Sequence, residues 1–160
     1  MKERSKFMSA EYFDAPEVEV IAKELIEDHH PNLCQAKIKY LFRTGDWESK
    51  GKTILGKAEK LNDKIKHLAG YDFIITINQI MFFAMTPQQR RALVDHELTH
   101  CFVDEDDSGN PVYKILPHDV EEFHSIIRRH GLWQEDLRKT ETAMEQHRQL
   151  SLFKRTGTEG

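Results

Sequence analysis

A chain of 160 residues with 39% hydrophobic and 31% charged residues has the size and composition of one soluble globular domain. Its net charge of −4 gives no global argument for nucleic-acid binding, and no apolar run is long enough to span a bilayer. Residues 1–9 lack the apolar core of a secretory signal. Cys34 and Cys101 form no Cys-x-x-Cys pair, so cysteine usage indicates a reducing cytoplasm.

The first half of the chain mixes helical and strand patterns. Residues 1–15 show no periodicity and are expected to be flexible. The strand predicted at residues 71–78 is apolar on both faces, so we expect it to be covered on both sides. In chain order the predicted elements are a helix over 16–30, a strand over 36–43, a polar loop over 47–52, a strand over 53–60, a short helix over 61–68, the strand over 71–78 and a helical turn over 79–85.

The second half is predicted to be mainly helical. A helix begins at Thr86-Pro87, where Thr86 can cap and Pro87 suits the first position. Acidic residues at 104–107 resemble the start of a calcium loop, but Ile115 stands where the loop needs Glu, which favours a solvated turn. The remaining predictions are a short strand over 112–116, a helix over 117–130 with Val120, Phe123, Ile126 and Ile127 buried, a polar helix over 134–150 and a tail over 151–160.

The stretch Asp95-His96-Glu97-Leu98-Thr99-His100 carries the pattern His-Glu-x-x-His. In a helix, His96 and His100 stack one turn apart, so both rings can bind one metal ion. Glu97 can reach a metal-bound water and take its proton while that water attacks a carbonyl. The other interpretation is a surface helix with two stacked histidines. We favour the metal site because Val94, Leu98, Cys101 and Phe102 fall on the opposite side of the predicted helix.

A catalytic zinc ion takes three protein ligands, so a third donor must follow the motif. His118 is the leading candidate, because it stands after a loop at a predicted helix start. Glu122 is the second, as a ligand or as a partner that holds a histidine ring. Asp119 is the third, and it also suits a helix N-terminus. The pair His29-His30 is interpreted as a solvated helix end, because adjacent helical residues do not face each other.

With these residues in view, the chain resembles the SprT-like zincin metallopeptidases, and most of all the small metallopeptidases of phages and prophages. The resemblance implies an α+β, zincin-like fold, in which a small sheet packs against the metal-binding helix and further helices follow. It also implies that the strand at residues 73–78 lies beside the cleft, where a peptide could add to its edge. The segments that carry the resemblance are Leu55-Gly56-Lys57-Ala58, residues 74–78, 93–100 and 118–123, and Arg129-His130-Gly131.

In SprT-like proteins a later His-Gly segment, followed shortly by Phe, supplies the third zinc ligand. Here His118 precedes Phe123 with one residue more than that pattern, and Asp119 replaces the glycine. An alignment on Phe123 therefore places Asp119 at the ligand position, so both residues stay candidates. The cysteines of a C-terminal zinc ribbon are missing. Their absence weakens the expectation that this chain shares the DNA–protein crosslink repair role known for some relatives.

The sequence therefore predicts a single metallopeptidase domain over residues 16–150, acting as a zinc-dependent endopeptidase. Its metal ligands would be His96, His100 and His118, and its general base Glu97. The expected partner is a protein or peptide substrate in the cytoplasm, that of a bacterial host if a phage encodes the chain; nucleic acid is weakly supported and no membrane is expected. The alternatives are a metal-stabilised phage or host binding factor without proteolytic activity, and a hydrolase of a non-peptide substrate.

Overall fold

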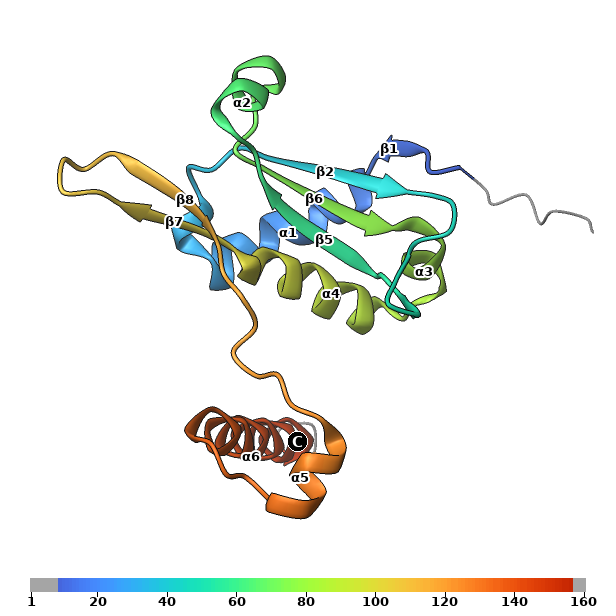
Figure 1. Ribbon diagram of the computed structural model, residues 1–160, viewed down its shortest axis with the longest axis vertical. Helices are drawn as coiled ribbons and strands as arrows, with labels where there is room; N and C mark the ends of the chain where they lie inside the picture. Colours follow the sequence, from blue (N-terminus) through green and yellow to red (C-terminus); the bar gives the residue numbers. More distant parts are fainter. Residues whose placement is uncertain (1–8, 157–160) are drawn as a thin grey trace, which may run out of the picture. The chain divides into compact units, whose positions relative to one another are not determined.

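The computed structural model describes residues 9–156, which form α-helices and small β-sheets (Figure 1). The chain divides into two compact units, Met1–Leu116 and Pro117–Gly160. The predicted flexible N-terminus and tail lie partly outside the described residues. The α+β class is confirmed, whereas the zincin fold and the single domain over 16–150 stay predictions.

A four-stranded sheet is the centre of the first unit (Figure 1). Its strands, in spatial order, are β1 (Tyr12–Asp14), β2 (Ile38–Arg43), β6 (Phe73–Asn78) and β5 (Gly56–Lys60). β2 and β6 are parallel, and the other two pairings are antiparallel. β1 is an ordered strand within the segment predicted to be flexible. The expectation of an open edge on β6 is wrong, because β6 pairs on both sides and β5 takes the edge position.

Burial explains why β6 is central. Phe73, Ile75 and Ile77 are fully buried, and Thr76 and Asn78 on the other side are nearly so. A strand apolar on both faces needs cover on both, so it cannot stand at a solvated edge. The prediction that this strand is covered on both sides is confirmed. The predicted helices before the motif correspond to α1 (Pro16–His29), α2 (Asp63–Ala69) and α3 (Gln79–Ala84). A short 3-10 turn, η1 (Pro31–Leu33), was not predicted.

The motif helix α4 (Pro87–His100) lies beside α1, and both pack into the core of the sheet. Their apolar contribution comes from Val18, Ala22 and Leu25 of α1 and from Val94 and Leu98 of α4, all buried. Full burial of each Val or Leu side chain stabilises the fold by about 1.5–3 kcal/mol relative to an exposed position. The two helices therefore hold the motif against a rigid sheet.

Two short hairpins complete the first unit. β3 (Glu48–Ser49) and β4 (Lys52–Thr53) pair within the segment predicted to be a polar loop, around Lys50 and Gly51 with positive φ. β7 (Cys101–Glu105) pairs with β8 (Pro111–Ile115). The helical placement of Cys101 and Phe102 is wrong: α4 ends at His100, because β8 pairs with the chain from Cys101 onward.

The second unit contains α5 (His124–His130) and α6 (Glu135–Thr156), with Leu137 buried between its neighbours. The start predicted at Pro117 is wrong, because residues 117–123 are irregular and α5 begins at His124, whereas the predicted end at His130 is confirmed. The Glu122 carboxylate accepts the N–H of Phe123 at 2.8 Å, directly before the helix starts. Phe123 is 76% exposed, contrary to its predicted burial. α6 extends past the predicted end near Leu150.

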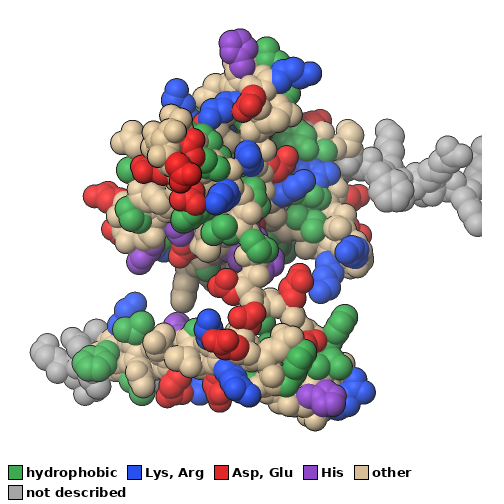
Figure 2. Space-filling view, turned by 60° about the vertical axis from the view of Figure 1, so that its left-hand side comes forward, with side chains coloured by type: hydrophobic (Ala, Val, Ile, Leu, Met, Phe, Trp, Pro, Cys, Tyr) green, Lys and Arg blue, Asp and Glu red, His purple; other side chains and the backbone are tan. Residues whose placement is uncertain are grey.

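Within residues 9–156 no helix is both long and apolar enough to cross a bilayer. On the face drawn in Figure 2, Lys and Arg side chains are interspersed with acidic and hydrophobic ones. Among the described residues on the face drawn, neither unit taken by itself shows a continuous basic surface for a phosphate backbone.

A buried carboxylate joins the sheet to the β7–β8 hairpin. Asp72 is 5% exposed; it accepts the Lys37 N–H at 2.8 Å and pairs with Lys66 Nζ at 2.7 Å. The same ammonium lies 3.9 Å from the centroid of the Tyr113 ring on β8. The hydrogen bond raises the pKa of Lys66, so the contact keeps the ammonium charged.

We predict that Asp72→Ala lowers the free energy of unfolding by about 1–3 kcal/mol, because the Lys37 N–H and the Lys66 ammonium lose their acceptor. Urea denaturation followed by circular dichroism measures the change. The control is Asp104→Ala, which breaks an exposed ion pair to Lys114 and should shift the midpoint less. Equal shifts in the two variants would contradict the role given to Asp72.

Candidate metal centre

The motif helix has a well-defined start. Thr86 Oγ1 accepts the Gln89 N–H at 3.2 Å, and Gln89 Oε1 accepts the Thr86 N–H at 3.0 Å. This capping box, with Pro87 at the first position, satisfies N–H groups that a helix end otherwise leaves unpaired. The predicted start is confirmed. Burial of Val94 and Leu98 fixes the rotation of α4 about its own axis. That rotation determines on which side of the helix the two histidines lie.

His96 and His100 stack on α4 as the spacing predicted. Their ring centroids are 5.0 Å apart, with the planes at 79°. His100 Nδ1 lies 2.6 Å from the Leu116 carbonyl oxygen. A carbonyl can only accept, so Nδ1 carries the proton and Nε2 holds the lone pair that a metal needs. Metal-binding histidines commonly have their second nitrogen fixed in this way.

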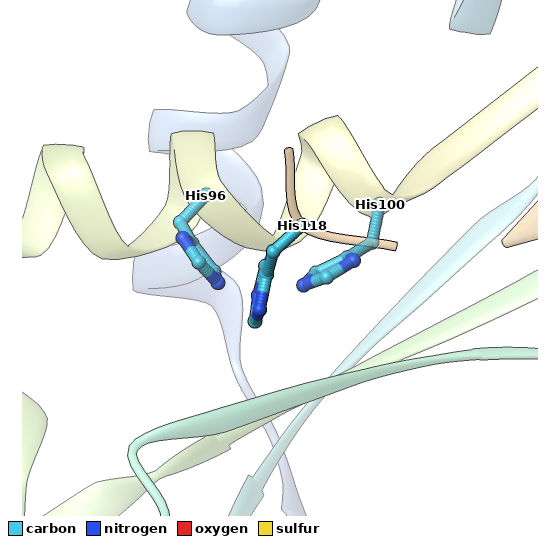
Figure 3. A group of neighbouring side chains, drawn as sticks. All are labelled: His96, His100 and His118. Carbon is cyan, nitrogen blue, oxygen red and sulfur yellow. The ribbon is translucent and has the colours of Figure 1, made fainter. Parts of the chain in front are cut away.

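His118 is brought to the same place by the end of β8. The Leu116 N–H donates to the His100 carbonyl oxygen at 2.8 Å, so residue 116 is bonded to the last residue of α4 twice. His118 follows two residues later. One ligand atom each from His96, His100 and His118 lies within 4.8 Å of the others, and Figure 3 shows the three rings pointing to the same side of α4.

The other two candidates for third ligand are not part of the histidine group. Asp119 lines a separate pocket of the second unit with Asp136 and Lys139 of α6. Glu122 accepts the Phe123 N–H at the start of α5. Among the described residues, the group that could hold a metal ion contains the three histidines and neither acid. Three imidazoles are a ligand set used at catalytic zinc sites, so the donor chemistry fits such an ion.

Glu97 is buried on the inner side of α4, with 4% of its surface exposed. Burial raises the pKa of this carboxyl, and the nearby His100 ring opposes the shift. Gly56, the first residue of β5, leaves the room that the carboxylate occupies. A Cβ at that position would lie 3.0 Å from Glu97 Oε1 and 3.1 Å from Ile77 Cδ1. Any larger residue at position 56 would therefore require the Glu97 carboxylate or the Ile77 side chain to move by a few tenths of an ångström, a constraint that spacing alone does not indicate.

Two side-chain contacts outside the metal group hold α4 against α1 and against His30, the residue that follows α1. His30 Nε2 lies 2.6 Å from Asp95 Oδ1, and Arg91 pairs with Glu24 at 2.9 Å. His30 is partly buried rather than the solvated helix end that was predicted. Its role was missed because the contact joins residues 65 positions apart, which local patterns do not reveal. Asp95 precedes His96, so this contact helps to position the first motif histidine.

Cys101 follows His100 but is no candidate ligand. Its side chain is buried, and Sγ donates to the Glu97 carbonyl oxygen at 3.7 Å. Burial raises the pKa of the thiol to about 12. A thiol with that pKa stays protonated near neutral pH, whereas metals bind the thiolate. Cys101 is therefore a thiol packed in the core.

The comparison with family models now bears on these residues. The model described as "Putative phage metallopeptidase" matches residues 10–144, which include the motif and His118. The chain belongs to this phage metallopeptidase family. The resemblance to that family noted from the motifs is confirmed. Searches of curated proteins and of solved structures found no match.

Membership implies a metal-dependent peptidase, and the histidine group could hold the ion that such an enzyme requires. A peptidase acts on protein or peptide substrates, which agrees with the predicted partner class.

We predict about one transition-metal ion per chain in the purified protein or after reconstitution. His96→Ala, His100→Ala and His118→Ala should each lose most of it, because two ligands hold an ion poorly. Elemental analysis by mass spectrometry measures the content. The control is His67→Ala, on the exposed surface of α2, which should keep the parent stoichiometry.

Retention of metal in His118→Ala alone would assign the third position to another donor. Absence of metal from the reconstituted parent would contradict the whole site.

Proposed function

We propose that this phage-family protein is a zinc-dependent endopeptidase. His96, His100 and His118 hold the ion, and Glu97 is the general base. The observation that carries the proposal is the convergence of three histidine ligand atoms within 4.8 Å beside a buried carboxylate on the same helix. Three neutral imidazoles leave a zinc ion one position for water or substrate, which is the arrangement of catalytic rather than structural zinc.

A bound zinc ion would lower the pKa of its water to near neutral and would polarise the carbonyl group of the substrate. The protein's own residues supply the rest. Glu97 takes a proton from the attacking water and gives it to the leaving amine. Its burial supports this role, because a raised pKa moves the carboxylate towards the proton affinity of a base that works near neutral pH. The Leu116 carbonyl keeps the His100 ring in the tautomer that binds metal.

The edge strand β5 supports the binding of an extended peptide. The Asn78 N–H donates to the Leu55 carbonyl oxygen, one residue beyond the paired residues Gly56 and Ile77. Leu55 and Asn78 therefore form a hydrogen-bonded pair, whereas Gly56 and Ile77 form a non-hydrogen-bonded pair. The two kinds of pair alternate along β5. It follows that Gly56 and Ala58 direct their backbone N–H and C=O groups towards the free edge. A peptide that adds there forms main-chain hydrogen bonds next to Glu97.

We predict that Glu97→Gln abolishes most peptide hydrolysis, by about 10²–10⁴-fold in kcat, because the amide cannot accept the proton. Gln is close in size to Glu, so the metal content should equal that of the parent. Cleavage of a quenched peptide library and of unfolded casein measures the activity.

The same variant separates catalysis from binding. If the parent cleaves and Glu97→Gln does not, with equal metal, catalysis by Glu97 is supported. If the parent cleaves no peptide while fully metal-loaded, the peptidase proposal fails, and a metal-stabilised binding factor takes its place.

We predict that Ala58→Pro lowers kcat/KM for peptides by about 10-fold or more, because one edge N–H is lost and the ring blocks the approach of the substrate. The fold should persist, because this N–H is not part of the ladder with β6. The control Ala58→Gly keeps the N–H and should stay near the parent value. Equal kinetics in the Pro variant and the parent would exclude substrate binding at this edge.

A further inference from the structure

A pocket of about 510 Å³ opens beside the proposed catalytic residues, within the unit Met1–Leu116. Residues 53–56, between β4 and the start of β5, form one wall. Met85, Gln89, Ala92 and Leu93, in and just before α4, form the other. His96 and Glu97 also line it, so the pocket is continuous with the reaction site. It belongs to the side of α4 that precedes the motif.

The lining is chiefly apolar. Leu55 is 37% exposed although it is a large aliphatic residue, and it faces the pocket together with Ile54, Met85 and Ala92. Apart from His96 and Glu97, none of the lining side chains is charged. Such a lining gives favourable free energy to an apolar side chain and leaves a charged one without a partner.

The wall at Ile54 and Leu55 is held in place before any ligand binds. The Asn78 side-chain amide donates to the Ile54 carbonyl oxygen at 3.0 Å, and its backbone N–H donates to the Leu55 carbonyl oxygen at 2.8 Å. The Ile54 N–H donates to the Trp47 carbonyl oxygen at 2.9 Å. These backbone groups are therefore used within the protein. The wall consequently offers its aliphatic side chains, in a pre-formed position.

The peptide edge and the pocket share Gly56. In a strand added along β5, alternate side chains point to opposite faces of the sheet. Gly56 would direct a Cβ towards Glu97 on α4. A substrate residue beside Gly56 with that orientation places its side chain on the α4 side, where the pocket opens.

We propose that this pocket binds a large apolar side chain next to the scissile bond, so that the enzyme cleaves extended segments beside Leu, Met, Ile or Phe. The inference rests on the proposed endopeptidase function and adds its substrate class. Ala92 is the specificity-determining position, because it is exposed on α4 and a larger side chain there occupies the pocket.

The test uses the metal-loaded chain of 160 residues and two extended peptides that differ only by Leu or Asp at one residue. That residue lies beside the cut found in a peptide library, or at the centre of the peptide if the library shows no cut. The parent should prefer Leu by about 10-fold or more in kcat/KM, which corresponds to the burial of one aliphatic side chain. Ala92→Phe should lower kcat/KM for the Leu peptide by a similar factor and so remove most of the preference over the Asp peptide. Gln88→Phe is the matched control, since it adds the same ring to the exposed surface of α4 outside the pocket.

A second readout does not require turnover. Binding of the same peptides to Glu97→Gln, measured by fluorescence anisotropy, should show the Leu preference and lose it in the double variant with Ala92→Phe. If the parent cleaves both peptides equally, the pocket proposal is overturned while the peptidase function stands. If nothing is cleaved but the Leu preference persists in binding, the pocket is supported and the peptidase function fails. No preference in either assay overturns the pocket proposal.

Discussion

The candidate metal centre depends on the junction between the end of α4 and the end of β8. Two hydrogen bonds join His100 and Leu116 in opposite directions, one from the Leu116 N–H and one from the His100 ring. The first ends the helix and starts a hairpin. The second selects the tautomer of a proposed ligand. Both hydrogen bonds join the same two residues. They therefore position His100 and also bring His118, two residues after Leu116, close to it.

The rest of the first unit stabilises that junction from two sides. The buried Asp72 holds Lys66 against the Tyr113 ring, which ties β8 to the sheet. The contact between Asp95 of α4 and His30, just after α1, holds α4 in place. A polar network of this kind contributes little net stability on a surface, but when partly buried it favours one arrangement over others. In this fold, that arrangement keeps the two motif histidines and the hairpin end together.

The cleft combines three properties that are independent in the sequence. Gly56 gives the Glu97 carboxylate its space, β5 presents free backbone groups, and the neighbouring pocket is apolar. The proposed endopeptidase would use the buried carboxylate as its base, the strand edge as a template for extended chains and the pocket as an apolar subsite. The family membership and the local geometry thus support the same class of chemistry.

The sequence by itself determined the elements whose signals are local: the helix start at Thr86-Pro87, the buried strand β6, and the pair His96 and His100, which helical spacing places together. Only the tertiary structure decided what depends on distant pairing. β6 lies inside the sheet and β5 at its edge because β2 and β5 both pair with it. Cys101 lies outside the helix because it pairs with Ile115 of β8. Residues 117–123, predicted to be helical, are irregular. His118, rather than Asp119 or Glu122, joins the histidines because the strand before it is bonded to the end of α4, a contact that no local pattern encodes.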